Sequence, residues 1–167
     1  EIRNDSNKEE IAHTGQPYDY KMSDATFNEM SIPKPDYRLE CGNLSHGAMT
    51  GRMLESIEGV MVKEKPDLVL IYGDTNSTLA GALGASKLHI PIAHVEAGLR
   101  SFNMAMPEEV NRILTDRISS YLFCPTNTAL KNLEDEGFPY ASSDKFMQRI
   151  FNVGDVMYDA TLFYAEK

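Results

Sequence analysis

The chain has 167 residues, of which 25 are acidic and 16 basic, so its formal net charge at pH 7 is −9. An acidic chain whose lysines and arginines are scattered is poorly suited to nucleic acid or to an anionic membrane, and we expect neither as a partner. The length suits one domain that buries about 70% of its unfolded surface. We therefore treat residues 1–167 as a single domain.

The first long element in chain order is a predicted helix over Ser45 to Glu64. Its apolar residues recur at a spacing of three to four, which marks a helix with one buried face. They are Met49, Met53, Ile57, Val60 and Met61.

Residues 67–98 predict two parallel strands joined by a helix. Residues 67–72 form an almost wholly apolar run closed by Gly73, which suits a strand buried on both faces. Asp74 or Thr75 can cap the following helix, which runs to about Lys87. A second apolar run, residues 92–95, ends at Glu96. Two strands around one helix make a right-handed crossover.

The rest of the chain continues this alternation. Pro107 fits the first turn of a helix, where its missing N–H is not needed. Residues 121–124 and 150–153 are predicted strands, followed by helices that begin near Pro125 and Asp155. Gly137 closes the first of those helices, and residues 140–146, YASSDKF, form a predicted polar loop. The fold class we expect is therefore α/β, a doubly wound parallel sheet of the Rossmann-like kind.

Three carboxylates, Asp74, Glu96 and Glu108, stand where a predicted element begins or ends. The ends of strands in an open parallel sheet face the ligand crevice, so these side chains are expected at one site. Each also has a structural explanation: Asp74 as a helix cap, and Glu108 with Glu109 at the positive end of a helix dipole. Glu96 is the hardest to explain this way, because a carboxylate at a buried strand end needs a charge, a hydrogen bond or a ligand.

Three further polar residues belong to the same part of the sequence as the carboxylates. His94 lies in the strand that ends before Glu96, and we expect a core histidine bonded to backbone on the side of the strand opposite Glu96. Arg100 and Arg112 could neutralise the acidic cluster, or could hold a phosphate or carboxylate. Spacing alone leaves both alternatives open.

Five motifs in one order give the chain a resemblance to a known family. They are HTGQ at residues 13–16, GDTNST at 73–78, HVEAGLR at 94–100, PEEVNR at 107–112 and NVGDVMYD at 152–159. The chain resembles the non-hydrolysing UDP-N-acetylglucosamine 2-epimerase family over nearly its whole length. The forms GDTNST, FNMAMPEE and VGDVMYD are most similar to the branch that acts on UDP-2,3-diacetamido-2,3-dideoxyglucuronic acid.

The resemblance implies a specific chemistry and a specific set of residues. Family members invert carbon 2 of the sugar by removing its proton, expelling UDP to leave a glycal-like intermediate, and adding both back. Carried over by motif, Asp74, Glu96 and Glu108 are the expected catalytic carboxylates, with Arg112 and Arg100 binding substrate. Removal of a carbon-bound proton needs a carboxylate held in water-poor surroundings, which agrees with this assignment.

The chain keeps two residues of a further site of the family and departs from the family pattern at three other positions. Gln16 and Arg52 match a second, regulatory substrate site found in some members, and as surface residues they would need no explanation. Pro17 stands where a histidine is usual, while Met104 and Ala105 replace residues that are commonly basic. These changes put the regulatory site and some substrate contacts in question.

The resemblance further predicts that the domain is incomplete at both ends. Members of the family open with a strand and a GTRP-like loop, and they continue into a second domain in a glycosyltransferase-B-like arrangement. We therefore expect residues 9–13 and 67–72 to lie in one sheet, unpaired with each other and roughly 9 to 10 Å apart, two strand spacings. The chain alone should show no turnover. The alternative to an epimerase is an incomplete fragment or a sugar-nucleotide-binding module.

No metal or nucleotide cofactor is expected. Cys41 and Cys124 lie far apart without a second ligand at metal spacing, and no dinucleotide fingerprint or GxxxxGK loop occurs. Two free cysteines without a secretory signal favour a reducing cytoplasm. For a full-length protein the family implies a homodimer in surface-polysaccharide synthesis.

Overall fold

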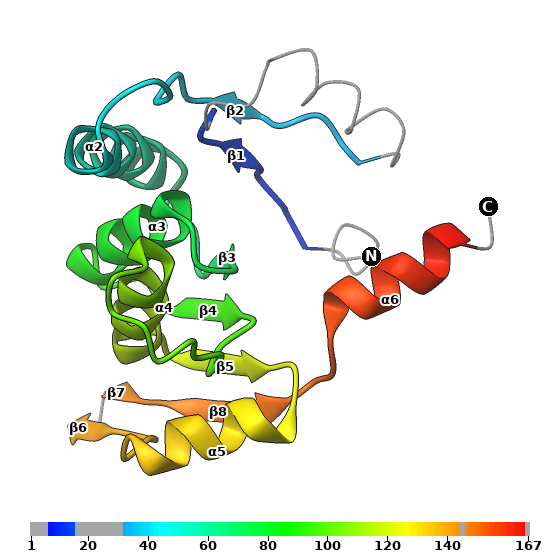
Figure 1. The fold of residues 1–167 in the computed structure, drawn as a ribbon. Coiled ribbons are helices and arrows are strands. Elements are labelled where there is room, and N and C mark those ends of the chain that lie inside the picture. Colours follow the sequence, from blue (N-terminus) through cyan, green and yellow to red (C-terminus); the bar gives the residue numbers. More distant parts are fainter. Residues whose placement is uncertain (1–6, 16–31, 144–145, 166–167) are drawn as a thin grey trace.

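The computed structural model describes residues 7–15, 32–143 and 146–165 and has an α/β architecture (Figure 1). Its main sheet has four parallel strands in the order β3-β4-β5-β8. The elements of this sheet and its crossovers are β3 Val69–Tyr72, α3 Asn76–Lys87, β4 Ile92–Val95, α4 Pro107–Ile118, β5 Tyr121–Cys124, α5 Asn127–Asp135 and β8 Arg149–Asn152. The predicted parallel α/β class is confirmed.

The central strand β4 is buried along its whole length. It pairs with β3 on one side and β5 on the other, with Ile71 opposite His94 and Leu122 opposite His94 on the far side. A strand buried on both faces must be apolar, which explains the uniform run that the sequence shows there. Because neighbouring strands run in parallel, their carboxyl ends meet at one edge of the sheet.

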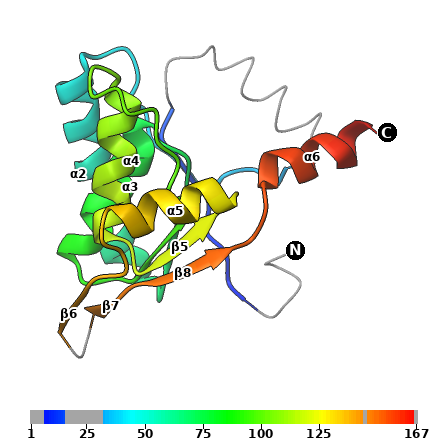
Figure 2. The same ribbon diagram turned by 60° about the horizontal axis from the view of Figure 1, so that its bottom comes forward.

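The helix predicted over residues 45–64 is α2, His46–Glu64. Its buried side chains are Met49, Met53, Ile57 and Met61, as the periodicity predicted. It packs against α3, and a Cβ added to Gly84 of α3 would lie 3.6 Å from a methyl of Leu54. Small residues on α3 therefore allow close approach of the two helices, and α3 in turn packs on α4 (Figures 1 and 2).

Besides the hydrophobic core that includes the buried side chains of α2 and α3, a second core lies where α5 packs on β5 and β8. It contains Leu122, Cys124, Ala129, Leu133 and Phe138. The α5 helix is capped by Thr126, whose hydroxyl accepts the N–H of Ala129 at 3.1 Å. It ends before Gly137, which has a φ of +81°, as the sequence predicted.

The expected sheet partners of the N-terminal strand are wrong. β1, Ala12–His13, pairs in parallel with β2, Tyr37–Arg38, in a separate two-stranded sheet. Within the described residues no strand pairs with both β1 and β3, so nothing joins the two sheets into one ladder. The absence of direct pairing between residues 9–13 and 67–72 is as predicted.

The polar loop predicted over residues 140–146 is also wrong. Here β6, Ala141–Ser143, pairs antiparallel with β7, Phe146–Met147. The reason lies just outside the hairpin, where the buried Gln148 accepts the N–H of Tyr140 at 2.9 Å on its side-chain oxygen. The side-chain amide of Gln148 donates to the carbonyl oxygens of Asp116 and Ser119, at 2.9 and 3.0 Å. A single glutamine thus fixes both ends of the hairpin to the domain.

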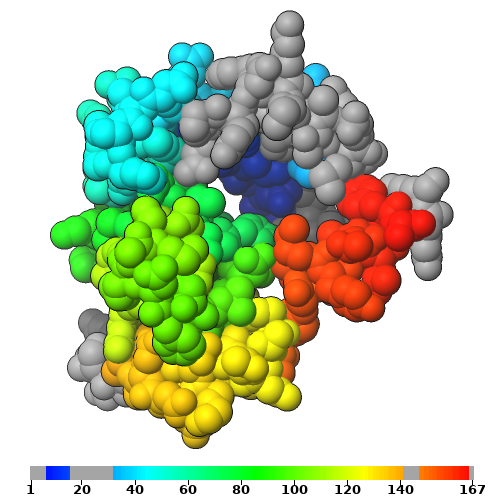
Figure 3. Space-filling view, viewed as in Figure 1, coloured from blue at the N-terminus to red at the C-terminus, as the bar shows by residue number. Residues whose placement is uncertain are grey.

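The last helix, α6, Val156–Ala165, has no buried residue and stands away from the sheet (Figures 1 and 3). Its exposed apolar side chains include Met157, Tyr158 and Phe163. None of the helices in the described ranges is both long and apolar enough to cross a membrane.

Candidate active site

Asp74 and Glu96 lie at the ends of two adjacent parallel strands. Asp74 follows β3 after Gly73, and Glu96 follows β4 directly. The strands are tied there by the N–H of Gly73, which donates to the carbonyl oxygen of Val95 at 3.1 Å. A Cβ added to Gly73 would lie 3.7 Å from Oε2 of Glu96, so that carboxylate sits beside the turn that carries Asp74. The structure thus brings together two of the three predicted carboxylates.

Glu96 combines a strained backbone with an unpaired carboxylate. Its φ is +72°, in the left-handed region that residues other than glycine seldom adopt. Its side chain is half-buried and has no hydrogen bond within the described part of the chain. Burial raises the pKa of Glu96, and the negative charges of Asp74 and Asp155 raise it further, against the opposing charges of His94 and Arg112. Strain and a raised carboxylate pKa occur together at functional sites.

Arg112 on α4 holds Asp74 in place. Its Nη2 donates to the Asp74 carboxylate and its Nη1 to Glu109 at 2.9 Å, while its buried Nε has no partner among the described residues. Asn111 adds a hydrogen bond from its side-chain amide to the carbonyl oxygen of Asp74 at 2.9 Å. The N-cap of α3 is Thr75, so the interpretation of Asp74 as a helix cap is wrong. Asp74 is instead oriented by the next helix of the sheet.

The two glutamates at the start of α4 differ in their surroundings. Glu109 is 1% exposed and accepts hydrogen bonds from the backbone N–H groups of Ser101 and Phe102 at 3.0 and 2.8 Å. Burial acts to raise the pKa of Glu109, but these N–H groups and Arg112 outweigh it, and the pKa lies below its usual range. Glu108 is half-buried and makes no such contacts within the described ranges. It stands one turn before Arg112 and so on the same face of α4.

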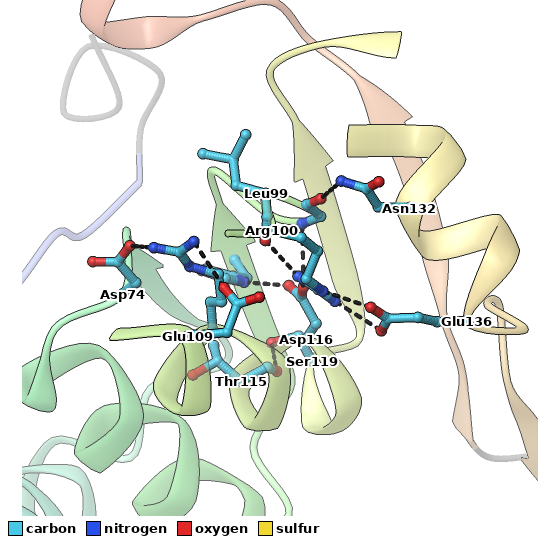
Figure 4. A network of polar contacts seen from close by, with 12 residues as sticks. Asp74, Leu99, Arg100, Glu109, Thr115, Asp116, Ser119, Asn132 and Glu136 are labelled. Atoms are coloured by element: carbon cyan, nitrogen blue, oxygen red, sulfur yellow. Dashed lines mark hydrogen bonds and ion pairs between the residues drawn. The ribbon is translucent and has the colours of Figure 1, made fainter. Parts of the chain in front are cut away.

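Arg100 lies in a buried ion-pair network (Figure 4). Its side chain is 1% exposed, and Nε and Nη2 donate to the two carboxylate oxygens of Glu136 at 2.6 and 2.9 Å. Its Nη1 donates to Asp116 at 2.7 Å and to the carbonyl oxygen of Leu99 at the same distance. The sequence left open whether Arg100 and Arg112 pair with carboxylates or hold a ligand, and in this structure both pair with carboxylates. The carboxylates that pair with Arg100, those of Asp116 and Glu136, lie outside the predicted acidic cluster.

Asp116 is the central residue of this network and was not identified from the sequence. It is fully buried and accepts from His94 Nδ1 at 2.7 Å, from the N–H of Gly98 at 3.1 Å and from Arg100. The spacing of Glu109, Arg112 and Asp116 along α4 was the available signal, because positions i, i+3 and i+7 share one helix face. Glu136 follows α5 and carried no signal.

His94 is a buried core histidine bonded to backbone, as predicted. Its Nε2 lies 2.8 Å from the carbonyl oxygen of Gly73, and its ring is fully buried. The predicted placement of His94 opposite Glu96 does not follow from strand alternation, because residues two apart in a strand share a face. Glu96 lies beyond the end of β4 with a φ of +72°, so alternation does not place its side chain. The contact of His94 with Asp116 was not predicted.

The HTG segment reaches the same edge of the sheet. The hydroxyls of Thr14 and Ser77 lie 2.6 Å apart, which joins it to the first turn of α3. Of the two predicted regulatory residues, Gln16 lies outside the described residues and Arg52 is exposed on α2. Their regulatory role stays a prediction.

No group of three or more histidine, cysteine or acidic side chains in the described ranges could hold a metal ion. Cys41 and Cys124 are both buried and unpaired. The charged groups that the structure brings together at this site are the carboxylates of Asp74 and Glu96 and the guanidinium of Arg112.

The family of this chain is shown by comparison with known proteins. The model of the family described as UDP-N-acetylglucosamine 2-epimerase matches residues 1–167. The chain belongs to that family, as its motifs predicted.

Individual relatives are similar over most of this chain. The chain is 61% identical over 157 residues to the UDP-2,3-diacetamido-2,3-dideoxy-D-glucuronate 2-epimerase of Pseudomonas aeruginosa, covering 94% of this chain and 43% of that protein. It is 54% identical over 152 residues to a UDP-N-acetylglucosamine 2-epimerase of Methanocaldococcus jannaschii, covering 91% and 40%.

Solved structures agree with this assignment. The crystal structure of the M. jannaschii enzyme in complex with UDP-GlcNAc and UDP has a TM-score of 0.89 at 50% identity, covering 99% of this chain and 45% of that one. The Neisseria meningitidis enzyme bound to UDP-GlcNAc has a TM-score of 0.85 at 33% identity, covering 98% and 43%. The chain spans less than half the length of these relatives.

Proposed function

We propose that this chain carries the carboxylate half of the active site of a UDP-sugar 2-epimerase, which inverts carbon 2 by elimination and re-addition of UDP. The observation that supports it most directly is the meeting of Asp74 and Glu96 at adjacent strand ends. Family membership and the sugar-nucleotide complexes of the relatives support the same reaction.

Glu96 is our choice for transfer of the carbon 2 proton. A base is more effective when its pKa is raised toward the working pH, and burial together with Asp74 raises the pKa of Glu96. Its lack of a partner within the described chain leaves the carboxylate free to face substrate. In this proposal Glu108 serves the second proton transfer, and Arg112 orients Asp74 and contacts substrate. Arg100, being buried between two carboxylates, would act on substrate only through the turn that it holds.

Neutral variants test the three carboxylates in a full-length version of the protein. Asp74→Asn, Glu96→Gln and Glu108→Gln should each lower turnover by about a hundredfold or more, as expected of acid, base or electrostatic groups. NMR of carbon 2 proton exchange in heavy water measures this directly. Glu58→Gln, an exposed carboxylate on α2, is the matched control and should exchange at the wild-type rate. If a variant of Asp74, Glu96 or Glu108 exchanges the carbon 2 proton at the wild-type rate, that residue is not catalytic.

We further propose that the preferred substrate is the UDP-diacetamido-uronate. The motif variants support this, as does the higher identity to the P. aeruginosa relative, 61% against 54% for the M. jannaschii relative. Side-by-side kcat/KM values for the two sugar nucleotides test it, because specificity is a difference in transition-state binding. Equal or better use of UDP-N-acetylglucosamine would assign the protein to the other branch.

The biological setting that we infer is a cytoplasmic homodimer serving surface-polysaccharide synthesis. The two buried, unpaired cysteines are compatible with a reducing compartment. Sedimentation of the full-length version tests the dimer, and a monomeric enzyme with full turnover would contradict it.

A further inference from the structure

His94 has an acceptor at each of its ring nitrogens. Nδ1 lies 2.7 Å from Oδ1 of Asp116, and Nε2 lies 2.8 Å from the carbonyl oxygen of Gly73. A carbonyl or carboxylate oxygen can only accept, whereas a neutral imidazole has one N–H and one lone pair. In a neutral ring, one nitrogen would therefore face an acceptor oxygen with its lone pair, and the two would repel each other. Only the doubly protonated ring satisfies both contacts.

The surroundings of Asp116 favour its carboxylate form. Its other oxygen, Oδ2, accepts from the N–H of Gly98 at 3.1 Å and from the guanidinium of Arg100 at 2.7 Å. Hydrogen bonds from charged donors stabilise an ionised acceptor, so the proton between the two side chains belongs to Nδ1. With Glu136 on the far side of Arg100, the buried network holds two positive and two negative charges (Figure 4). A buried charge network is stable only when its members are paired in this way.

The ring of His94 connects the two turns that carry the candidate catalytic carboxylates. Its Nε2 holds the carbonyl group of Gly73, the residue before Asp74. The N–H of Gly73 donates to the carbonyl oxygen of Val95, the residue before Glu96, and Oε2 of Glu96 lies 3.7 Å from where a Cβ on Gly73 would be. The same histidine, through Asp116, is joined to Gly98 in the turn after Glu96. Each turn is thus fixed to the other through one ring.

We propose that His94, kept as an imidazolium by Asp116, is a positioning residue that fixes Asp74 and Glu96 relative to each other and places a permanent positive charge beneath them. This role rests on the proposed function, since it concerns the carboxylates of that reaction. The ring of His94 is fully buried, so in this proposal it acts through the two turns and not by contact with substrate. Its charge is one of four that act on Glu96: Asp74 and Asp155 raise the pKa of Glu96, while His94 and Arg112 oppose that rise. Loss of the imidazolium charge would therefore move the pKa of Glu96 upward.

The charge state is tested on the 167-residue chain, without any assay of activity. Nitrogen-15 NMR of histidine rings distinguishes protonated from unprotonated ring nitrogens. We expect two protonated nitrogens for His94 at neutral pH, because each of them faces an oxygen that accepts. A single protonated nitrogen on His94 would overturn the proposal whatever the enzyme does.

The variant Asp116→Asn removes the counter-charge and keeps the side-chain shape. Its amide can donate to Nδ1, so His94 can remain in place as the neutral ring with its proton on Nε2, which still bonds to Gly73. Thr115→Val is the matched control, because Thr115 is equally buried on α4 and its hydroxyl has no partner in the described part of the chain. Asp116→Asn should show one unprotonated nitrogen on His94, and Thr115→Val should show none.

Kinetics of the same variants in a full-length version test the positioning role. Asp116→Asn should lower kcat about tenfold or more with little change in KM, and should move the rate limb of the base to higher pH. Thr115→Val should leave kcat and the pH profile unchanged. An unaltered pH profile and kcat in a folded Asp116→Asn enzyme would overturn the proposal. Absence of carbon 2 exchange in the wild-type enzyme would instead refute the proposed function, and the NMR result would stand apart from it.

Discussion

Replacement of Gly98 by alanine tests how the HVEAGLR turn is packed. Gly98 has a φ of +78°. A Cβ at this position would lie 2.9 Å from the carbonyl carbon of Ala129, closer still to its oxygen, and 3.1 Å from Cγ of Leu133. Two of these atoms are backbone of α5, which cannot yield as a flexible side chain would. The only remedy is a shift of the turn away from the helix.

Two effects add to the cost of Gly98→Ala. A left-handed backbone costs a residue with a Cβ about 1–2 kcal/mol. Overpacking against fixed neighbours costs about 1–3 kcal/mol more. The total, about 2–5 kcal/mol, corresponds to a fall in melting temperature of roughly 4–20 °C for a domain of this size. Such a loss is a large part of the stability of an ordinary domain.

Urea unfolding followed by circular dichroism measures the effect of Gly98→Ala against a matched control. Gly59 lies in α2 with nothing within 4 Å of an added Cβ. Because alanine is the better helix former, Gly59→Ala should be stabilising by about 0.5–1 kcal/mol. The two changes add the same methyl group and should act in opposite directions. A Gly98→Ala chain that unfolds at the wild-type urea concentration would refute the close approach of the turn to α5.

Three further predictions concern titratable side chains that are wholly or partly buried. The pKa of Glu109 is lowered, so its stabilising effect is present above the unfolded pKa of about 4.3 and is lost as pH falls through the folded pKa. Glu109→Gln should therefore cost about 1–3 kcal/mol at pH 7, and a melting-temperature gap from wild type that persists unchanged at pH 3 would contradict this. The pKa of Glu96 is raised, mainly by burial, so its ionised form destabilises the fold and its stability contribution is lost as pH rises through the folded pKa. Glu96→Gln should raise stability at pH 7 by on the order of 0.5 kcal/mol, since the group is partly screened, even as turnover falls; a lower melting temperature would count against it. Burial raises the pKa of the Cys124 thiol to about 12, so iodoacetamide at pH 8 should label it only on unfolding, and rapid labelling of the native chain, seen by peptide mass spectrometry, would show it to be accessible.

Local patterns in the sequence determined most of the elements of this fold. The run from residue 92 to 95 is apolar because β4 is buried on both faces, and the spacing of Met49, Met53 and Ile57 follows one face of α2. These signals are local, since a strand or helix repeats every two or three to four residues. The same signals could not predict the hairpin after residue 140, because its ends are fixed by Gln148 bonding to carbonyl groups of a distant helix.

The sequence also determined that Asp74 and Glu96 would meet, because parallel strands end at one edge of a sheet. It could not determine which charges pair there. Arg112 bonds to Asp74 across 38 residues, and Arg100 bonds to Glu136 across 36, with nothing in the spacing to select these partners. Ion pairs depend on distances of a few ångströms, and such distances are decided by how α4 and α5 pack on the sheet. The order of its motifs thus identifies the family of this chain, whereas only its tertiary structure shows that Asp116 is the buried residue that joins His94 to the turn carrying Glu96.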